Sequence, residues 1–321
     1  MKILVTGAAG FIGSTFVDFA LSKGCEVVGV DNFETGLREF LSSAFENESF
    51  QFIKCDIRNE SELKKAFAKS SADWIVHFAA NADVRHGTEQ PRRDLDFNTT
   101  GTLNVLEAAR LAGITRILFS STGSVYGEPE IFPTPENCPF PVQTSLYAAS
   151  KLAGEALISS YCVGFGFTGL VYRFVSILGP RYTHGHVFDF MKSLRSDPTK
   201  LRVLGDGKQC KSYLHIEDLM DGIWLGIQSA VDKEFQIYNI GHEDTLLVDQ
   251  SIGFIAERLG IKPELEHTGG KRGWIGDSPR IQLDASKLKL LGWAPKYCLK
   301  KAVEDTVDYL KEHPSLFEAR T

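Results

Sequence analysis

The chain has 321 residues, enough for one large domain or for a cofactor-binding domain with a smaller second lobe. Its 43% hydrophobic and 24% charged residues are ordinary for a globular protein that folds in water. The formal net charge of -6 provides no basic footprint for nucleic acid as the main partner. No apolar run reaches the about 18 residues that a membrane span needs, so we expect neither a nucleic-acid nor a membrane partner.

Six cysteines lie far apart and none forms a C-x-x-C pair, so the sequence signals neither a zinc site nor a redox pair. Reduced cysteines are typical of cytosolic proteins. Gly7, Gly10 and Gly13 interrupt the first apolar run too early for the apolar region of a signal peptide. We therefore expect a cytoplasmic protein.

The first half of the chain alternates between short apolar strands and amphipathic helices. This pattern indicates a parallel sheet covered by helices on both faces. The predicted strands are Lys2–Thr6, Glu26–Val30, Phe52–Lys54, Trp74–Phe78, Arg116–Ser120 and Gly169–Phe174. The predicted helices are Phe11–Lys23, Glu60–Lys69, Thr99–Ala112 and Tyr147–Tyr161.

The pattern loosens after Phe174. A turn at Gly179-Pro180 and a hairpin-like break at Gly205-Asp206-Gly207 separate short extended pieces. Further helices are predicted near Glu217–Gln228, Val248–Leu259 and Lys300–Leu310. We expect a smaller C-terminal α/β lobe, with segments near 211–242 returning to the first domain. Four prolines make residues 132–141 a loop.

A glycine-rich segment follows the first predicted strand directly and opens the first predicted helix. It reads Gly7-Ala8-Ala9-Gly10-Phe11-Ile12-Gly13, a G-x-x-G-x-x-G pattern. One glycine makes the tight turn, one lets backbone N–H groups approach a pyrophosphate, and one lets helix and strand pack closely. The helix N-terminus then favours the negative charge. The segment predicts a dinucleotide-phosphate site, the alternative being a tight turn without a ligand.

Asp31 ends the second strand and is followed by Asn32. A carboxylate at this place can bind both hydroxyls of the adenosine ribose and would repel a 2′-phosphate, so we expect NAD rather than NADP. The structural alternative is that Asp31 caps the next turn. Asp56 and Ile57 end the third strand, where the adenine would lie. Three residues end the fourth strand beside the expected path of the dinucleotide: Phe78, Ala79 and Ala80.

Tyr147 and Lys151 are four residues apart and share one face of the predicted helix. A free tyrosine has a pKa of about 10 and is a poor base at neutral pH. A nearby ammonium and an oxidised nicotinamide favour the phenolate, so Tyr147 could take a proton from a sugar hydroxyl while NAD takes the hydride. Thr122 would hydrogen-bond the reacting oxygen. The Tyr–Lys spacing alone also arises by chance, but its place one strand–helix unit after Ser120-Ser121-Thr122 favours catalysis.

Together these motifs resemble those of the extended short-chain dehydrogenases. Within them the chain is similar to the nucleotide-sugar epimerases and dehydratases, the UDP-glucose 4-epimerases above all. The resemblance covers nearly the whole chain. It also rests on His77–Ala80, Asn98, Ser120–Gly127, Arg173-Phe174, Gly179–Arg181, Gly205–Gly207, Tyr213–Asp218 and Leu291–Pro295.

The resemblance implies a Rossmann-type, doubly wound α/β fold. It implies an NAD-binding domain over residues 1–174, a nucleotide-sugar lobe over 175–321, and tightly held NAD. It also implies homodimers packed through two long helices, here those containing Asn104 and Leu152. The expected cofactor contacts are Gly7, Gly10, Phe11, Ile12, Gly13, Asp31, Asn32, Asp56, Ile57, Phe78, Ala79, Ala80, Asn98, Ser120, Tyr147, Lys151 and Phe174.

The residues after Thr122 bear on the reaction. An epimerase turns the 4-keto sugar and returns the hydride to its other face, which needs only the Tyr, the Lys and a Ser or Thr. The related 4,6-dehydratases usually place Asp-Glu immediately after the threonine, and the decarboxylases a glutamate. Gly123 and Ser124 stand there instead and cannot act as acid or base, which favours 4-epimerisation. A 4,6-dehydratase or a C4-dehydrogenase stays open.

Substrate contacts are expected at Arg85, Thr122, Ser124, Ser176, Arg181, His186, Lys211, Arg272 and Asp277. Several of them depart from the family pattern, since Ser176 replaces an Asn and Lys211 replaces an Arg that binds the diphosphate. Lysine supplies the charge but not a bidentate fork. The nucleotide-diphosphate sugar therefore stays open, with UDP as the commonest choice.

Two further alternatives remain. His184 and His186 have no cluster of further metal ligands beside them in the sequence, so we expect no metal site. The two alternatives for these histidines are contacts to the sugar or diphosphate and a place in a solvated loop. A non-catalytic NAD-binding sensor is the rival to an enzyme, and the joint presence of Thr122, Tyr147 and Lys151 argues against it.

Overall fold

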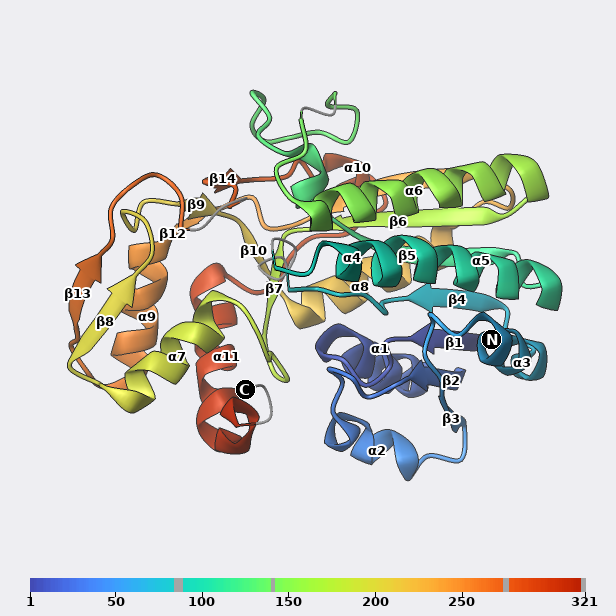
Figure 1. The fold of residues 1–321 in the computed structure, drawn as a ribbon, viewed down its shortest axis with the longest axis horizontal. Coiled ribbons are helices and arrows are strands. Elements are labelled where there is room, and N and C mark those ends of the chain that lie inside the picture. The colour runs from blue at the N-terminus through green and yellow to red at the C-terminus, as the bar shows by residue number, and fades with distance from the viewer. Residues whose placement is uncertain (84–88, 140–141, 274–276, 319–321) are drawn as a thin grey trace. The chain divides into compact units, whose positions relative to one another are not determined.

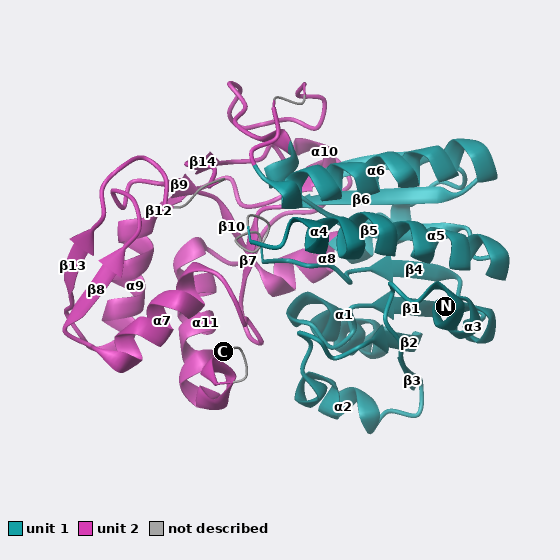
Figure 2. Cartoon of the chain, viewed as in Figure 1, with its two compact units in different colours: residues 1–125, 145–173, 223–238 teal, residues 126–144, 174–222, 239–321 magenta. Residues whose placement is uncertain are grey.

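A computed structural model describes residues 1–83, 89–139, 142–273 and 277–318. The chain folds into two compact units, coloured separately in Figure 2. Unit 1 comprises residues 1–125, 145–173 and 223–238, and unit 2 comprises residues 126–144, 174–222 and 239–321. Both units are therefore assembled from segments that lie far apart in the sequence.

The sheet of unit 1 has seven strands in the order β11-β6-β5-β4-β1-β2-β3. The pairings of β1 with β2 and β4, of β2 with β3 and of β4 with β5 are parallel. This order, which reverses at β1, is that of the Rossmann-type doubly wound fold and confirms the predicted fold class. The strands are β1 Lys2–Thr6, β2 Glu26–Asp31, β3 Phe50–Lys54, β4 Trp74–His77, β5 Arg116–Thr122, β6 Thr168–Phe174 and β11 Phe235–Ile240.

Helices cover this sheet on both faces. The helices α3 Glu60–Ser70, α5 Gly101–Ala112 and α6 Leu146–Phe165 share one hydrophobic core with the strands, and Figure 1 shows α5 and α6 side by side. α1 Phe11–Ser22 meets α8 Ile216–Ser229 through the rings of Phe19 and Trp224, whose centroids are 6.0 Å apart. Shorter helices are η1 Arg38–Leu41, α2 Ser42–Phe45, α4 Pro91–Asp94, the π-helix η3 Leu95–Thr100 and η4 Gly123–Tyr126.

Unit 2 is built from small sheets and three packed helices. β7 Ser176–Leu178 pairs in parallel with β10 Tyr213–His215, and β8 Lys200–Val203 with β13 Glu264–His267. β9 Cys210–Lys211 lies between β12 Leu246–Leu247 and β14 Arg280–Ile281. The helices α7 His186–Ser196, α9 Val248–Leu259 and α11 Leu299–Glu312 pack on one another, and α10 Ser286–Lys289 and η5 Pro314–Phe317 complete the unit (Figure 1).

Most predicted elements recur within a residue or two, and the differences have physical causes. The helix predicted from Thr99 starts earlier, with α4 and η3, because Pro91 is favoured in a first helical turn. β5 continues to Thr122, beyond the predicted end. α7 was not predicted, since residues 181–186 suggested a loop. The break expected at 205–207 is present between β8 and β9, but it is not a hairpin, because these two strands pair with other strands.

None of the described helices is long and apolar enough to cross a lipid bilayer.

The close approach within the glycine-rich turn generates a first prediction. A Cβ at Gly13 would lie 2.0 Å from the Gly7 carbonyl oxygen, so Gly13→Ala must displace the turn. We expect a loss of between about 1 and 3 kcal/mol in the free energy of unfolding, measured by urea denaturation.

Gly164→Ala on α6 is the matched control, because no atom lies within 4 Å of its Cβ position. An alanine there should be neutral or stabilise by about 0.4–1 kcal/mol. Equal stability of the two variants would show that the turn tolerates the extra carbon.

Candidate active site

The glycine-rich turn joins β1 to α1 and leaves room for a ligand backbone. Gly7 has a φ of 70°, and a Cβ on it would lie 2.6 Å from the Ala79 backbone nitrogen. Gly10 is the N-cap of α1, makes no side-chain capping bond, and precedes Phe11 and Ile12 in the first turn. The first N–H groups of a helix without a side-chain cap are suited to an anion. The turn therefore fits a pyrophosphate, as the sequence predicts.

Asp31 ends β2 with a buried carboxylate that serves two local bonds. Its Oδ2 accepts from the Ala9 N–H at 2.9 Å, and its Oδ1 accepts from the Phe33 N–H at 2.7 Å. Burial raises the pKa of Asp31, and the backbone hydrogen bonds oppose that rise. Asp31 thus caps the next turn, which was the structural alternative, and also ties the glycine-rich turn to the end of β2.

Asn32 and Asp56 form a second polar group at the ends of β2 and β3. The Asn32 Nδ2 donates to Asp56 at 2.8 Å, and the Arg58 Nη2 lies 2.6 Å from the same carboxylate. Hydrogen bonds from Arg58 lower the pKa of Asp56 to about 2. The next residue, Ile57, is buried and its carbonyl accepts from Asn104 at 2.9 Å.

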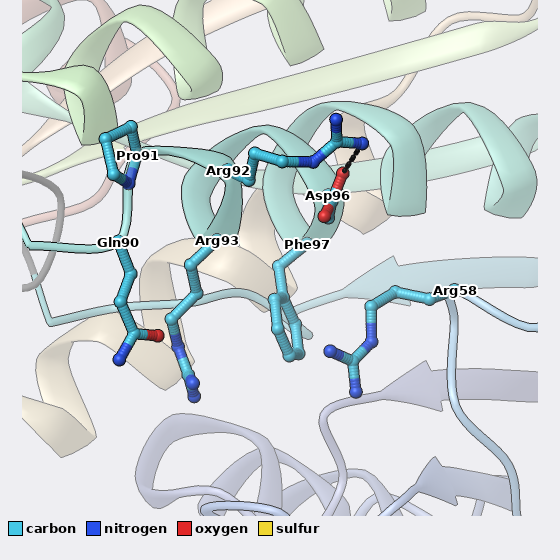
Figure 3. A pocket seen from close by; sticks show the side chains of 7 residues that line it. All are labelled: Arg58, Gln90, Pro91, Arg92, Arg93, Asp96 and Phe97. Carbon is cyan, nitrogen blue, oxygen red and sulfur yellow. Dashed lines mark ion pairs between the residues drawn. The ribbon is translucent and has the colours of Figure 1, made fainter.

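An open pocket of about 340 Å³ lies beside this polar group (Figure 3). Figure 3 shows the Phe97 ring between the guanidinium groups of Arg58 and Arg93. These groups lie 3.8 and 5.1 Å from the centroid of the ring, within cation–π distance. The remaining lining residues are Gln90, Pro91, Arg92 and Asp96.

Phe78, Ala79 and Ala80 follow β4, and the turn they form is tied to the π-helix. The Phe78 N–H donates to the Thr6 carbonyl at 3.1 Å, which holds the turn beside the glycine-rich segment. The Asn98 side chain accepts from the Asn81 N–H at 2.8 Å and donates to the Ser150 hydroxyl at 3.0 Å. Asn98 is buried, so it connects the turn after β4 to α6.

Thr122, Tyr147 and Lys151 meet where β5 ends and α6 begins. Tyr147 is hydrogen-bonded by the Thr122 hydroxyl, and the Ser124 N–H donates to that hydroxyl at 3.1 Å. The Lys151 Nζ donates to the Ser120 carbonyl at 2.8 Å. The structure thus brings together the three residues that the sequence singled out as catalytic candidates.

Removal from water governs the acid–base properties of this pair. It raises the pKa of Tyr147 to about 12, against the opposing hydrogen bond from Thr122. It lowers the pKa of Lys151 to about 7, while the charges of Glu155 and Asp94 act to raise that pKa. Burial therefore outweighs the hydrogen bond from Thr122 at the Tyr147 phenol.

Three predicted substrate residues of unit 2 lie together. The Lys211 Nζ is 2.5 Å from the Asp277 Oδ1, and the Gly273 N–H donates to the other carboxylate oxygen at 3.0 Å. The Arg272 Nη1 donates to the Asp277 backbone carbonyl at 3.1 Å, and its guanidinium forms an ion pair with Glu128. Lys211 and Arg272 are thus cationic hydrogen-bond donors that Asp277 and Glu128 hold in place.

The other candidates of unit 2 have separate surroundings. Ser176 is exposed at the start of β7, and Arg181 has a left-handed φ of 69°. His186 begins α7, contacts Ser251 at 2.9 Å, and packs against Tyr213. Burial lowers the pKa of His186 to about 3, so its ring is neutral.

Two remaining candidates have no place in this description of the site. Phe174 is the first residue of its segment in unit 2 and is buried there, and Arg85 lies outside the described residues. Within the described ranges, no three His, Cys, Asp or Glu side chains form a group that could hold a metal ion.

The sequence analysis did not single out the buried residues behind Tyr147 and Lys151. Glu155 is four residues after Lys151 on α6 and forms a buried ion pair with Arg173 of β6. The repeated four-residue step from Tyr147 through Lys151 to Glu155 was visible in the sequence. The sequence did not show which strand residues that helix face would contact.

Comparisons with known proteins find similar sequences and similar structures. The UDP-glucose 4-epimerase of Mycolicibacterium smegmatis is 33% identical, over 97% of this chain and 99% of its own length. The Thermus thermophilus UDP-glucose 4-epimerase, solved as a complex with NAD, is 33% identical with a TM-score of 0.86, covering 97% of this chain and 99% of that one. The Streptomyces venezuelae dTDP-glucose 4,6-dehydratase DesIV is 28% identical with a TM-score of 0.88, covering 98% of each chain.

A family model matches residues 3–241, three quarters of the chain. The glycine-rich turn, the Asp31 carboxylate and the Tyr147–Lys151 pair all lie within the matched segment. This chain belongs to the NAD dependent epimerase/dehydratase family.

Proposed function

We propose that this chain is an NAD-dependent nucleotide-sugar 4-epimerase. The observation that carries the proposal is the hydrogen-bonded Thr122–Tyr147 pair beside the anchored Lys151, followed by Gly123 and Ser124. This arrangement supplies one acid/base group and no second one in the next two positions. The similarity to UDP-glucose 4-epimerases supports the same reading.

Proton transfer at the sugar falls to Tyr147. Its phenolate would take the proton of the 4-hydroxyl, and Thr122 would hydrogen-bond the reacting oxygen and help to relay the proton. NAD, when bound, would supply the acceptor and donor of the hydride at carbon 4, so that the 4-keto sugar could be reduced on its other face, and its positively charged ring would favour the phenolate. Tyr147 then returns the proton, so the side chains end in their starting state.

Lys151 holds the geometry for this transfer. Its bond to the Ser120 carbonyl fixes the ammonium beside the end of β5, where it would also bind the nicotinamide ribose. With a pKa of about 7, Lys151 loses its proton within the neutral range unless a bound ligand favours the charge. We therefore expect cofactor binding to raise the pKa of Lys151 and to lower that of Tyr147.

The glycine-rich turn, Asp31, Asn32 and Asp56 would hold the rest of the cofactor, in a domain spanning residues 1–174. The turn would take the pyrophosphate, and Asp31 would accept from the adenosine ribose hydroxyls. Asp31 already accepts two backbone bonds, and each carboxylate oxygen has a further lone pair for a ribose hydroxyl.

The nucleotide-sugar would be bound mainly by residues of the lobe spanning 175–321. Lys211 and Arg272 supply the charge for a diphosphate, and Asp277 orients both of them. Ser124, Ser176, Arg181, Arg85 and His186 remain proposed substrate contacts. We further propose a cytoplasmic location, in which the six free cysteines stay reduced.

A 4,6-dehydratase is the second candidate, because DesIV is similar over the whole chain. That reaction removes a proton at carbon 5 and water from carbon 6, and Gly123 and Ser124 provide neither an acid nor a base for it. A C4-dehydrogenase would release the ketone. The two alternatives and the epimerase differ in their products.

A homodimer is part of the proposal. Exposed apolar side chains on α5 and α6 are Leu103, Leu111, Leu146, Val163 and Phe165. Exposed apolar residues gathered on adjacent elements are typical of protein–protein interfaces. Two copies packed through these helices would cover them.

Product analysis by NMR tests the function. Purified protein is incubated with UDP-, GDP-, CDP- and dTDP-linked hexoses and hexuronic acids, without added reductant. We expect an equilibrium mixture of two sugars differing only at carbon 4. A 4-keto or 4-keto-6-deoxy product would replace the epimerase with one of the alternatives.

The Tyr147→Phe variant is the matched control for this assay. It keeps the ring and loses the acid/base group, so turnover should fall by about 10²- to 10⁴-fold while NAD stays bound. Nearly full turnover in this variant would remove Tyr147 from the mechanism. Absence of turnover in both proteins, with NAD bound, would favour the sensor.

Titration of the phenol provides a separate prediction. Since burial raises the pKa of Tyr147 to about 12, the protein without NAD should keep this phenol protonated at pH 11. Absorbance at 295 nm measures phenolate, and the wild type and Tyr147→Phe should show equal increases up to that pH. One additional phenolate in the wild type near pH 10 would contradict the prediction.

Oligomeric state tests the dimer. Leu103→Glu together with Ala156→Glu places charges on the exposed sides of α5 and α6, where burial in an interface would be costly. We expect a monomer by light scattering, against a wild-type dimer. Leu290→Glu in unit 2, where the leucine is 88% exposed, is the control and should remain dimeric.

A further inference from the structure

A buried ion pair lies behind the catalytic side chains. Glu155 of α6 is 4% exposed and Arg173 of β6 is 1% exposed. The Arg173 Nε donates to the Glu155 Oε1 at 3.0 Å, and the Nη2 donates to the Oε2 at 2.7 Å. Two charges withdrawn from water are retained at a cost that only close, forked geometry offsets, so such a pair is weak evidence for stability. Its geometry points to another role.

The position of Glu155 relates it to the catalytic pair. Tyr147, Lys151 and Glu155 follow one another at steps of four residues and therefore share one face of α6. Tyr147 is bonded by Thr122, and Lys151 donates to the Ser120 carbonyl. The last three residues of β5, Ser120-Ser121-Thr122, form its catalytic end, and these two contacts hold the first and the last of them.

The middle residue of that segment completes the pattern. The Ser121 hydroxyl donates to the Glu155 Oε1, and the same oxygen accepts from Arg173. Three successive residues of β5 are thus each held by one residue of the α6 face. Arg173 fixes the carboxylate from the neighbouring strand, since β6 is next to β5 in the sheet.

We propose that Glu155 and Arg173 are positioning residues that lock the catalytic end of β5 against α6 and so set the geometry and charge of the Lys151 ammonium. The proposal rests on the proposed function, because it assigns Lys151 its catalytic role. Glu155 and Arg173 would act without touching the substrate.

The electrostatic part follows from the groups around Lys151. These are Glu155 on its own helix, Asp94 in α4 and His77 in β4, with Tyr147 one turn earlier on the same face of α6. Burial holds the pKa of His77 at about 3, so its ring is neutral. Glu155 and Asp94 both act to raise the pKa of Lys151, and Glu155 is the larger of these two effects.

Two substitutions separate charge from geometry. Glu155→Gln keeps the shape and removes the charge, so the pKa of Lys151 should fall. The protonated lysine is then lost at lower pH, and the alkaline limb of the kcat–pH profile should move to lower pH. Glu155→Asp keeps the charge but shortens the side chain. It should leave that limb in place and reduce kcat between about tenfold and a hundredfold through misplacement.

A direct titration keeps this test independent of turnover. The holoenzyme is labelled with 13C at the lysine Cε, and the Lys151 resonance is assigned by its loss in Lys151→Met. We expect the Lys151 resonance to titrate at lower pH in Glu155→Gln than in the wild type, and at the wild-type pH in Glu155→Asp. If no sugar is turned over but this shift occurs, the proposed function fails while the role of Glu155 stands.

An effect on folding must be distinguished from an effect on Lys151. Glu155→Gln leaves the Arg173 charge buried without its partner. If this variant does not fold, Glu155→Asp, which keeps both charges, still tests the geometry. Thr168→Val is a stability control on β6, because it removes the hydrogen bond from the Lys233 N–H at the other end of the strand from Arg173. It should lower the melting temperature without shifting the alkaline limb of the kcat–pH profile or the pH at which the Lys151 resonance titrates. Equal pKa values of Lys151 in the wild type and Glu155→Gln, or an unchanged kcat in Glu155→Asp, would overturn the proposal.

Discussion

Lys151 donates to the Ser120 carbonyl in surroundings withdrawn from water, and the catalytic arrangement depends on this contact. The contact fixes the ammonium, but the same burial lowers its pKa to about 7 and raises that of Tyr147 to about 12. The burial that holds Lys151 in place therefore also disfavours its charged form. Acidic groups behind the lysine shift the balance toward the charged form, and a bound cofactor would shift it further.

Strand register brings the separate parts of the site to one edge of the sheet. Thr6 of β1 pairs with His77 of β4, and His77 pairs with Phe119 of β5. The residues that follow each of them, Gly7, Phe78 and Ser120, consequently lie at the same edge. A buried contact of 2.6 Å between Thr6 and His77, and another of 3.0 Å from His77 to Thr102, fix this register from within. The polar chain thus supports the turns that carry the site.

The sequence predicted the features that are encoded locally. The spacing of Gly7, Gly10 and Gly13 reports a tight turn by itself, and the four-residue step from Tyr147 to Lys151 defines one helix face without knowledge of the fold. Strands between amphipathic helices then lead to the sheet, and its order follows the known connection rules.

Features that depend on distant partners could not be predicted in this way. Glu155 reads as an ordinary charge of an amphipathic helix until Arg173 and Ser121 are placed beside it, 18 and 34 residues away. The packing of the His186 ring against Tyr213, 27 residues later in the chain, likewise depends on a partner that the local sequence does not indicate. The short strands of unit 2 carry too few residues to show a period, so the sequence did not indicate which of these strands pair with each other.

The atom balance at the site argues for isomerisation over elimination. A side chain that takes one proton and gives one back, beside a cofactor that accepts and returns one hydride, leaves no net change except the configuration at carbon 4. Loss of water at carbon 6 would need a base for the proton at carbon 5 and an acid for the departing oxygen, in addition to Tyr147. Gly123 has no side chain, and the hydroxyl of Ser124 is too weak as either acid or base. With Thr122 bonded to Tyr147, the end of β5 and the start of α6 fit the one reversible proton transfer that a 4-epimerase requires.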